Sequence, residues 1–325
     1  METRNIGKTN LSVPVIGLGC WQLGGGWGNP WDDAAAQRIL DGAVATGVRF
    51  FDTADVYGDG DSERSIGRYL RSHSEVTVAT KLGRAGIFPD KYSRETLRAA
   101  VMASLERLGL EQIPLIQLHR IPPSILREGK VFEWLRELRQ EGLIAHFGAS
   151  VETMAEAMLC MEQDDLASLQ IIFNLFRQKP IDVLLPSALE RKVGIIVRLP
   201  LASGLLSGKI NSGTVFREGD HRNFNRDGQH FNVGETFAGL ELPTGIALAG
   251  ELAAMVPAGM TMAQMALRWI LDHEAVSVVI PGASSPAQAE ANAVAASLPP
   301  LPAELHARLR AFYQDSVHSA IRGPY

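Results

Sequence analysis

The chain has 325 residues, of which 46% are hydrophobic and 21% are charged, with 31 glycines and 17 prolines; these values are typical of a soluble globular protein. The net charge of -5 and the isoelectric point near 5.9 argue against a nucleic-acid or acidic-lipid partner, because no basic field would attract a polyanion. The two cysteines, Cys20 and Cys160, lack a CxxC spacing, so we predict neither a disulfide framework nor a zinc knuckle or other metal site. We see no signal-peptide core and no apolar run of about 18 residues, so we expect a cytoplasmic protein with no membrane partner.

The N-terminal residues predict a short β-hairpin. Its strands are Thr3–Ile6 and Leu11–Val13, and its turn is Gly7–Asn10, where glycine and asparagine tolerate the required dihedrals. A buried strand, Val15–Gly19, follows and leads into a glycine-rich loop.

The glycine-rich loop carries two tryptophans, Trp21 and Trp27. One interpretation is a flexible connector. The other is a loop where the backbone approaches a ligand and the two indoles form a wall of the substrate pocket.

After this loop, predicted helices and strands alternate regularly. The helices show apolar residues at helical spacing, with capping residues such as Ser62 and Ser93 at their starts and glycines such as Gly47 and Gly109 at their ends. The predicted helices are 32–46, 62–70, 93–108, 131–140, 152–161, 180–191, 245–255, 261–272, 286–295 and 303–314. The predicted strands begin at Val15, Val48, Val76, Leu115, Ile144, Leu169, Ile195 and Val276.

Strands that alternate with helices imply a parallel sheet with right-handed crossovers. Eight such units suit an α/β fold of the (β/α)8 TIM-barrel type, which typically takes about 250 residues plus insertions. A doubly wound sheet is the alternative, but it usually places G-x-G-x-x-G after its first strand, and here Gln22 stands where the third glycine should be. We therefore predict one TIM-barrel domain over residues 1–325.

A long stretch after the seventh strand, residues 199–243, interrupts the alternation and is rich in glycine. A structureless loop of this length inside a compact domain is usually functional, often as a lid over the cofactor and substrate. The competing interpretation is a disordered or decorative insertion. We expect the lid.

Polar residues follow the carboxyl ends of the predicted strands, where barrels of this type carry their chemistry. They are Asp52, with Tyr57 just beyond it, Lys81, His119, Ser150, Gln170 and Arg198. Each residue alone has an ordinary explanation, such as a solvated charge at the rim. Their joint placement on successive strand ends indicates an active site.

These residues lie within motifs that resemble the aldo-keto reductase family over nearly the full length of the chain. The motifs are FDTADVYG at 51–58 followed by Ser62-Glu63, Thr80-Lys81, Gln117-Leu118-His119, Gly148-Ala149-Ser150, Gln170 with Asn174, PLASGLLSGK at 200–209, and IPGASS at 280–285 ending in Asn292. The resemblance is to bacterial-type members, related to potassium-channel β-subunit-like and general-stress-type proteins. It also implies that the N-terminal hairpin closes the bottom of the barrel.

The resemblance assigns a catalytic tetrad of Asp52, Tyr57, Lys81 and His119. Reduction of a carbonyl by hydride transfer leaves an alkoxide that needs a proton. A free tyrosine, with a pKa of about 10, is a poor acid near neutrality, but a nearby ammonium lowers the pKa of a phenol. We therefore expect Tyr57 to be the general acid and Lys81 to tune it. Asp52 would hold Lys81 in place, and His119 would bind and orient the carbonyl oxygen of the substrate.

The resemblance also implies a nicotinamide cofactor, NADP(H) first and NAD(H) as an option, bound extended and without a Rossmann domain. Ser150 and Gln170 would hydrogen-bond its carboxamide, with Arg198 beside the ring. The residues expected along the pyrophosphate are Leu201, Ser203, Gly204, Leu206 and Lys209. Those expected at the adenosine end, near the N-terminus of a helix where phosphate binds readily, are Gly282, Ser284, Ser285, Gln288 and Asn292.

Three positions depart from the pattern of the family. Val151 follows Ser150 where asparagine is common, which would remove one contact to the carboxamide. Arg198 stands where an aromatic residue often stacks on the nicotinamide; a planar guanidinium can stack too, but its charge would disfavour the cationic oxidised ring. The segment 282–288 lacks the lysine or arginine that often holds the 2'-phosphate, so that phosphate would be held less tightly.

The sequence therefore predicts a nicotinamide-dependent oxidoreductase that reduces aldehydes or ketones, with sugars among the candidates, to alcohols. Its partner would be a small carbonyl or alcohol substrate. Two alternatives stay open: an NAD-dependent sugar or alcohol dehydrogenase working oxidatively, and a regulatory subunit of the same fold that binds the cofactor and a partner protein. The sequence specifies neither the natural substrate nor the oligomeric state.

Overall fold

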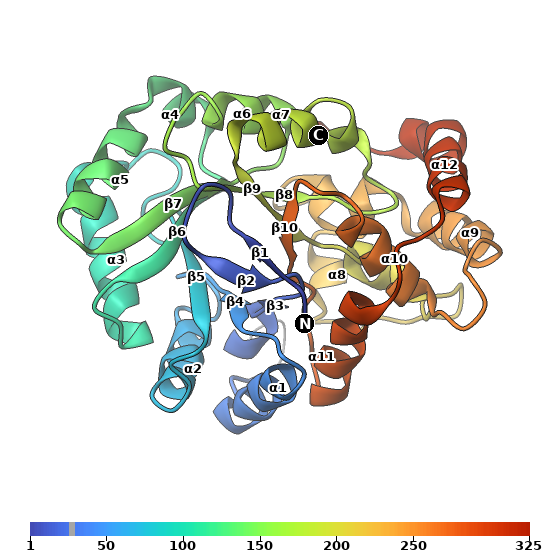
Figure 1. Cartoon of the computed structure of the whole chain (residues 1–325), viewed down its shortest axis with the longest axis horizontal. Helices are drawn as coiled ribbons and strands as arrows, with labels where there is room; N and C mark the ends of the chain where they lie inside the picture. Colours follow the sequence, from blue (N-terminus) through green and yellow to red (C-terminus); the bar gives the residue numbers. More distant parts are fainter. Residues whose placement is uncertain (26–29) are drawn as a thin grey trace.

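The centre of the molecule is a parallel β-barrel (Figure 1). In the computed structural model, which describes residues 1–25 and 30–325, eight strands form one sheet in the order β10-β9-β8-β7-β6-β5-β4-β3. They are β3 (Leu18–Gly19), β4 (Phe50–Asp52), β5 (Thr77–Leu82), β6 (Ile113–His119), β7 (Ile144–Ser150), β8 (Ser168–Ile172), β9 (Gly194–Arg198) and β10 (Val276–Val279). All neighbouring strands of this sheet pair in parallel, which confirms the predicted barrel.

Backbone hydrogen bonds close the barrel between its first and last strands. The amide of Gly17 donates to the carbonyl of Val279 at 2.8 Å, and the amide of Gly19 donates to the carbonyl of Pro281 at 3.0 Å. A Cβ atom at Gly19 would lie only 2.9 Å from the carbonyl oxygen of Ile280. Glycine at this position therefore permits the close approach that seals the barrel.

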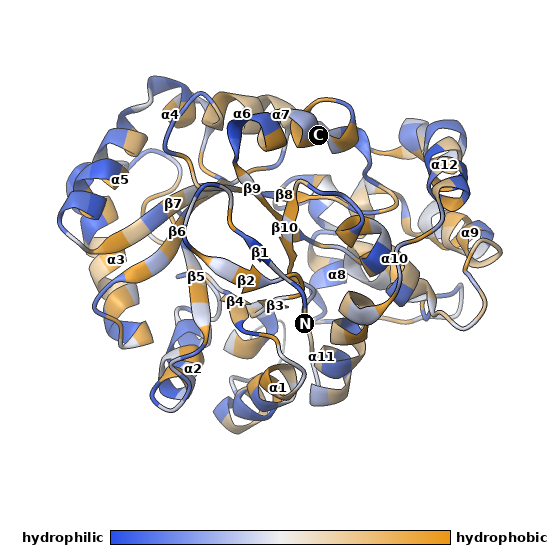
Figure 2. Ribbon diagram, viewed as in Figure 1, coloured by the Kyte–Doolittle hydropathy of each residue, from blue (hydrophilic) through white to orange (hydrophobic). Residues whose placement is uncertain are grey.

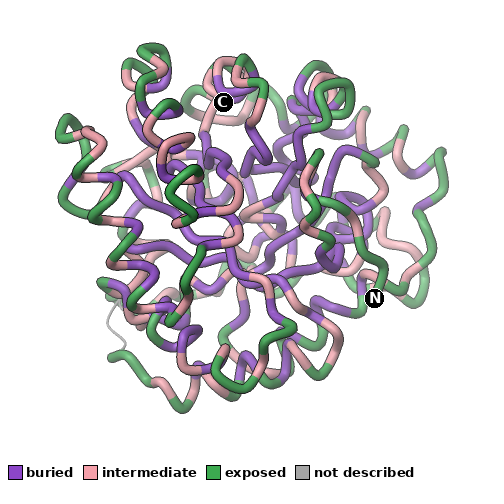
Figure 3. The backbone as a smooth tube through the Cα atoms, turned by 60° about the vertical axis from the view of Figure 1, so that its left-hand side comes forward, coloured by how far each residue is buried: buried purple, intermediate pink, exposed green. Residues whose placement is uncertain are grey.

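Helices surround the barrel, with apolar faces toward the strands and polar faces outward (Figure 2). They are α1 (Asp33–Ala45), α2 (Asp61–Leu70), α3 (Arg94–Leu108), α4 (Pro123–Glu128), α5 (Lys130–Gln140), α6 (Met154–Cys160), α7 (Leu184–Arg191), α8 (His221–Phe224), α9 (Leu242–Ala253), α10 (Met262–Leu271), α11 (Pro286–Ala293) and α12 (Ala303–Phe312). The tube in Figure 3 shows that buried residues gather at the strands and exposed ones at the outer turns. No helix in the described part of the chain is both long and apolar enough to cross a bilayer.

The N-terminal hairpin, β1 (Thr3–Asn5) and β2 (Ser12–Pro14), lies across one end of the barrel (Figure 1). Its Ile6 and Val13 are fully buried in the apolar cluster that fills the barrel interior. The barrel's members of that cluster are Phe50, Ala79, Leu115, Ala167, Ile196, Val278 and Ile280. The hairpin therefore fills the N-terminal end of the barrel, which leaves the carboxyl ends of the strands for chemistry.

The start of α2 differs from the predicted one. The helix begins at Asp61 after Gly60, whose φ of 88° suits glycine, so Ser62 is not its cap. The Ser62 hydroxyl instead lies 2.8 Å from that of Thr53 and donates to the carbonyl of Cys20 at 2.8 Å. Ser62 therefore ties the helix to the strand ends around the site.

Other boundaries also differ from the predictions. The predicted first strand, Val15–Gly19, shortens to β3, because its earlier residues meet the last strand only through isolated contacts. The predicted helix 180–191 divides into a 3-10 turn, Lys179–Ile181, and α7. The six-residue α4 has no predicted counterpart, since so short a helix shows no clear periodicity.

The stretch 199–243 contains short helical turns rather than structureless chain. Besides α8 it holds three 3-10 turns, Ala202–Ser207, Val233–Glu235 and Phe237–Gly239. The buried side chain of Asn225 accepts hydrogen bonds from the amides of His230 and Phe231. These bonds fix the path by which the stretch returns toward the barrel. Its role as a lid remains a prediction.

The packing of α2 on α3 generates a prediction about stability. A Cβ atom at Gly67 would collide with the backbone carbonyl of Arg107, whereas nothing lies within 4 Å of one at Gly250 on α9. Gly67→Ala should therefore destabilise the fold, by on the order of 1–3 kcal/mol of overpacking. The matched control Gly250→Ala should stabilise it by roughly 0.5–1 kcal/mol, because alanine favours the helix. Urea unfolding followed by circular dichroism measures both free energies, and equal effects would contradict the packing argument.

Candidate active site

The site is built on a buried ion pair at the ends of β4 and β5. Asp52 is the last residue of β4, and Lys81 lies one residue before the end of β5. Because the two strands are adjacent and parallel, both side chains reach the same end of the barrel. The Lys81 ammonium lies 2.5 Å from a carboxylate oxygen of Asp52, and the two side chains are only 1% and 3% exposed. Lys81 also donates to the carbonyl of Thr53 at 2.8 Å.

The ion pair keeps Lys81 charged. Burial alone would lower the pKa of Lys81, because it disfavours the charged form, but the Asp52 carboxylate and Tyr57 raise this pKa above its ordinary value. Lys81 is therefore a fixed cation at neutral pH.

Tyr57 lies beside this ion pair on the turn that follows β4. The Lys81 ammonium donates to the Tyr57 hydroxyl at 3.3 Å and lies 4.9 Å from the centroid of its ring. Close backbone packing holds the turn, since a Cβ atom at Gly58, where φ is 59°, would collide with the carbonyl of Gly24. The phenol thus shares one ammonium with the Asp52 carboxylate.

His119 ends β6, and its ring meets that of Tyr57 edge-on with centroids 5.8 Å apart. Burial lowers the pKa of His119 well below its ordinary value, and the charges of Lys81 and Arg120 lower it further. The imidazole is therefore neutral at physiological pH, with one N–H donor and one acceptor. Its Nδ1 is buried and has no hydrogen-bond partner within residues 1–25 and 30–325.

Two glutamine side chains support Asp52 on its other oxygen. Gln117 on β6 donates to that oxygen at 3.0 Å, and Gln170 on β8 donates to it at 2.8 Å. The hydroxyl of Ser150, at the end of β7, lies 3.4 Å from the amide oxygen of Gln170. Ser150 and Gln170 thus lie side by side, but the amide nitrogen of Gln170 already donates a hydrogen bond to Asp52.

Gln117 is absent from the predicted site residues, although it precedes His119 in one of the motifs. The sequence does contain a sign of this role. Gln117 is a polar residue two positions after Leu115, whose side chain faces the barrel interior. Alternate residues of a strand face the same side, so Gln117 and His119 both point inward. A polar side chain at an inward position of an apolar strand could have identified it.

A second group of charges lies beyond the imidazole. Arg198, which ends β9, forms an ion pair with Glu235 at 2.6 Å and donates to the carbonyl of Val151 at 3.1 Å. Arg120 contacts Glu235 at 3.1 Å and Glu152 at 3.0 Å. Burial would raise the pKa of Glu235, but the two arginines lower it to about 2. The charge of Arg198 is therefore shared with a carboxylate from the long loop, a partner that the sequence did not reveal.

Comparisons with known proteins agree with this geometry. The model described as "Aldo/keto reductase family" matches residues 15–314. The chain belongs to the aldo/keto reductase family. An uncharacterized oxidoreductase of Mycobacterium tuberculosis is 35% identical over 315 residues, covering 94% of this chain and 90% of the relative.

Two further comparisons extend the family relationship. A probable voltage-gated potassium channel subunit beta of Arabidopsis thaliana is 29% identical over 319 residues, covering 93% of each chain. The solved structure of a glycerol dehydrogenase from Gluconobacter oxydans aligns with a TM-score of 0.81 at 26% identity, covering 99% of this chain and 98% of that one. The relationship to channel β-subunits that the motifs implied is thus confirmed.

In this aldo/keto reductase, the segment expected to hold the pyrophosphate is a tight, irregular turn. Ser203 and Gly204 have positive φ angles of 55° and 100°. The amides of Gly204 and Leu206 both donate to the carbonyl of Leu201, at 2.9 and 3.2 Å. These two amides are satisfied within the turn, so their contact with a pyrophosphate remains a prediction, as does that of the exposed Lys209.

The residues expected at the adenosine end gather at the N-terminus of α11. Ser285 caps the helix by accepting from the amide of Gln288 at 3.3 Å, and the Gln288 side chain accepts from the amide of Ser284 at 2.9 Å. Asn292 donates to the carbonyl of Gly282 at 3.3 Å. The five residues therefore lie together, while their contact with a cofactor remains a prediction.

Of the two tryptophans expected in the substrate pocket, Trp27 lies outside the described residues. Trp21 begins the turn after β3, and its ring meets that of His221 on α8 edge-on, with centroids 4.6 Å apart. This contact joins the glycine-rich loop to the long loop. The place of Trp21 in the substrate pocket remains a prediction.

A hollow of about 1070 Å³ lies at the opposite end of the barrel, beside the start of β10. Arg4, Asp272 and His306 contribute to its lining, and the tetrad does not. The Asp272 carboxylate is already engaged by His306 at 2.9 Å and by Arg268 at 2.9 Å. Asp272, Arg268 and His306 bind one another, and no tetrad residue lines this hollow, so the chemistry favours the carboxyl ends of the strands as the site.

The buried ion pair generates a second prediction about stability. Asp52→Asn leaves the Lys81 ammonium buried without its carboxylate, which should destabilise the fold by roughly 3–5 kcal/mol. Adding Lys81→Met should restore much of that loss, because no uncompensated buried charge remains. Urea unfolding of the single and double variants measures the difference.

The control for this comparison is Asp61→Asn, which removes a partly exposed ion pair with Arg64. It should change the free energy of unfolding by less than about 1 kcal/mol. A double variant in which the losses at Asp52 and Lys81 simply add would show that the two charges do not interact.

Proposed function

We propose that this aldo/keto reductase reduces aldehydes or ketones to alcohols, with a nicotinamide cofactor as hydride donor and Tyr57 as general acid. The observation that carries the proposal is the Lys81 ammonium, which contacts both the Asp52 carboxylate and the Tyr57 hydroxyl. A cation held in this way stabilises the negative charge that remains on the phenol oxygen when its proton leaves.

Each residue of the tetrad has a separate task. When bound, the cofactor supplies the hydride. Tyr57 gives its proton to the carbonyl oxygen, and Lys81 offsets the charge left on the phenol. Asp52 keeps Lys81 charged and in place. The neutral His119 orients the carbonyl oxygen by donating a hydrogen bond.

The described residues suit a nicotinamide cofactor. A carboxamide needs a hydrogen-bond donor and an acceptor side by side, and Ser150 and Gln170 offer both at directly paired positions of β7 and β8. At the other end, the N-terminus of α11 and the hydroxyls of Ser284 and Ser285 can accommodate a phosphate. We therefore propose NADP(H), with the nicotinamide toward Tyr57 and the adenosine toward α11.

The variant Tyr57→Phe tests the proposed acid, because it removes the proton and leaves the ring. We expect kcat with a saturating aldehyde and NADPH to fall by roughly 10²–10⁴-fold, the usual contribution of a general acid. Steady-state assays measure this, and fluorescence titration verifies that the variant still binds NADPH.

Tyr69→Phe is the matched control, because Tyr69 stacks on His73 at the outer helix α2, away from the ion pair. It should keep the turnover of the unaltered protein. Near-normal turnover by Tyr57→Phe would disprove the assignment.

A second candidate is an NAD-dependent sugar or alcohol dehydrogenase working in the oxidative direction. Two observations favour it: the segment 282–288 carries no cation for a 2'-phosphate, and the Gln288 side chain is bonded to Ser284. The structural relative from Gluconobacter oxydans is a glycerol dehydrogenase.

Binding of the two reduced cofactors separates the candidates. We expect NADPH to bind more tightly than NADH in fluorescence-quenching titrations. A preference of 100-fold, about 2.7 kcal/mol, would eliminate the NAD-dependent candidate. Equal affinities, or tighter binding of NADH, would replace the first candidate with the second.

A further inference from the structure

The rim around the candidate site carries a group of arginines and carboxylates. Arg120 and Arg198 come from the ends of β6 and β9, and two carboxylates, Glu152 and Glu235, face them at 2.6–3.1 Å. A third arginine, Arg84, follows the end of β5. This part of the rim therefore carries three guanidinium groups and two carboxylates, and both carboxylates pair with Arg120 or Arg198.

The backbone holds Arg84 close to the candidate site. A Cβ atom at Gly83 would lie 2.8 Å from the side chain of Ile121, so the chain after β5 packs on the chain after His119. The Tyr92 hydroxyl donates to the carbonyl of Gly83 at 2.9 Å, which fixes the turn. Arg84 therefore begins its side chain next to the segment that follows His119, and its charge acts on the His119 imidazole.

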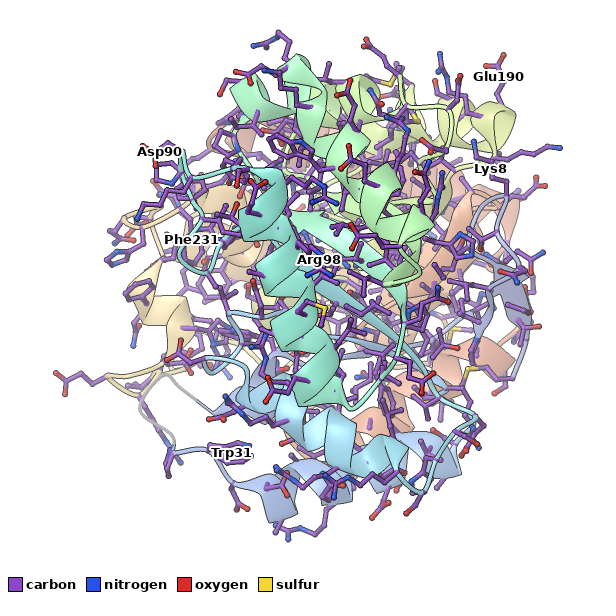
Figure 4. The ribbon with its side chains drawn as sticks, turned by 90° about the vertical axis from the view of Figure 1, so that its left-hand side faces the viewer. Lys8, Trp31, Asp90, Arg98, Glu190 and Phe231 are labelled. Carbon is purple, nitrogen blue, oxygen red and sulfur yellow. The ribbon has the colours of Figure 1, made fainter. Side chains whose placement is uncertain are left out.

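The surrounding loops lie at the same end of the molecule. Figure 4 shows Asp90, on the loop after β5, and Phe231 of the long loop on one side of the molecule, and Lys8 of the hairpin on the opposite side. The guanidinium of Arg120 lies over the ring of Phe231, 5.3 Å from its centroid. These loops therefore flank the carboxyl ends of the strands, where a substrate must approach Tyr57.

Arg84 has no ion-pair partner among residues 1–25 and 30–325, and the nearby carboxylates Glu152 and Glu235 are engaged by the other arginines. Its half-buried guanidinium lies over the ring of Phe88, 4.7 Å from the centroid. Burial lowers the pKa of Arg84, and the charge of Arg120 lowers it further. This is the environment of a cation that an added anion would stabilise.

We propose that Arg84, with Arg120 beside it, binds an anionic group of the substrate, so that the natural substrate is an aldehyde or ketone bearing a carboxylate or a phosphate. The inference rests on the proposed carbonyl reduction and names the substrate class of that site. A guanidinium can bind either anion through two parallel hydrogen bonds. His119 orients the carbonyl oxygen while Arg84 holds the other end of the molecule.

Matched pairs of substrates test the proposal. The carboxylate pair is 4-formylbenzoate and the uncharged 4-formylbenzamide, and the phosphate pair is glyceraldehyde 3-phosphate and glyceraldehyde. With NADPH, we expect kcat/KM to be at least 10-fold higher for the anionic member of one pair. The pair that shows the preference identifies the anion.

The variant Arg84→Met should lower kcat/KM for the anionic member at least 10-fold and leave the neutral member unchanged, and Arg84→Lys should recover part of the loss. The matched control is Arg98→Met. Arg98 lies on α3 and forms a partly exposed ion pair with Glu141, so its replacement should change neither value. No preference in either pair, or an equal loss for both members in Arg84→Met, would overturn the proposal.

Equilibrium binding separates this inference from the proposed reaction. Isothermal titration calorimetry with benzoate, benzamide and inorganic phosphate needs no turnover. If no carbonyl compound is reduced but benzoate or phosphate binds in a manner that Arg84→Met abolishes, the reaction is wrong and the anion site stands. If carbonyl compounds are reduced but neither anion binds through Arg84, the reaction stands and the anion site is wrong.

Discussion

The buried contact between Asp52 and Lys81 is the interaction on which the candidate site depends. Removing two charges from water costs several kcal/mol per ion, and their attraction offsets this only when their remaining polar atoms also find partners. Here two glutamine side chains satisfy the second oxygen of Asp52, and the Thr53 carbonyl accepts from Lys81. The partners come from β4, β5, β6 and β8, so the pair is satisfied only when those strands are assembled. The fold and the proposed acid–base chemistry therefore share one requirement.

One strand shows how a packed core and a polar site coexist in the same barrel. In β6, Leu115 belongs to the apolar interior that the N-terminal hairpin completes. Gln117 and His119 follow at the two-residue period that keeps them on the same inward face. The change from apolar to polar occurs along one row of side chains, toward the carboxyl end of the strand. The hairpin fills the apolar end, which places the buried charges at the end where a substrate can enter.

The order of strands and helices was predictable because hydrophobic periodicity and glycine stops mark most of them, and Asp52, Lys81 and His119 could be placed together because each lies at or near a strand end. The role of Glu235 could not be predicted. It lies in a stretch without periodicity, and its contact with Arg198 exists only because short turns bring the loop back to the barrel. The expectation that the charge of Arg198 would disfavour the oxidised nicotinamide ring did not include the Glu235 carboxylate that pairs with this arginine. The prediction of Ser62 as a helix cap was wrong because the partners of its hydroxyl are distant in sequence. The hydroxyl contacts Thr53 and the carbonyl of Cys20, near the ends of two strands, and not the first turn of its own helix.

The arginines near His119 act on the charge of the imidazole and, as proposed, on the charge of the substrate, whereas Lys81 acts on the proposed proton donor. Their positive charges oppose protonation of the imidazole, so they help to keep it a neutral hydrogen-bond donor. An anionic group bound at Arg84 would cancel part of that charge, but burial is the largest cause of the lowered pKa of His119 and would remain. Burial therefore still disfavours protonation of the imidazole when an anion is bound, in keeping with Tyr57 as the proposed proton donor. Lys81 is held by Asp52 on the barrel side of the phenol, whereas the unpaired Arg84 follows the end of β5 at the rim. One set of cations can thus stabilise the acid while another selects the substrate.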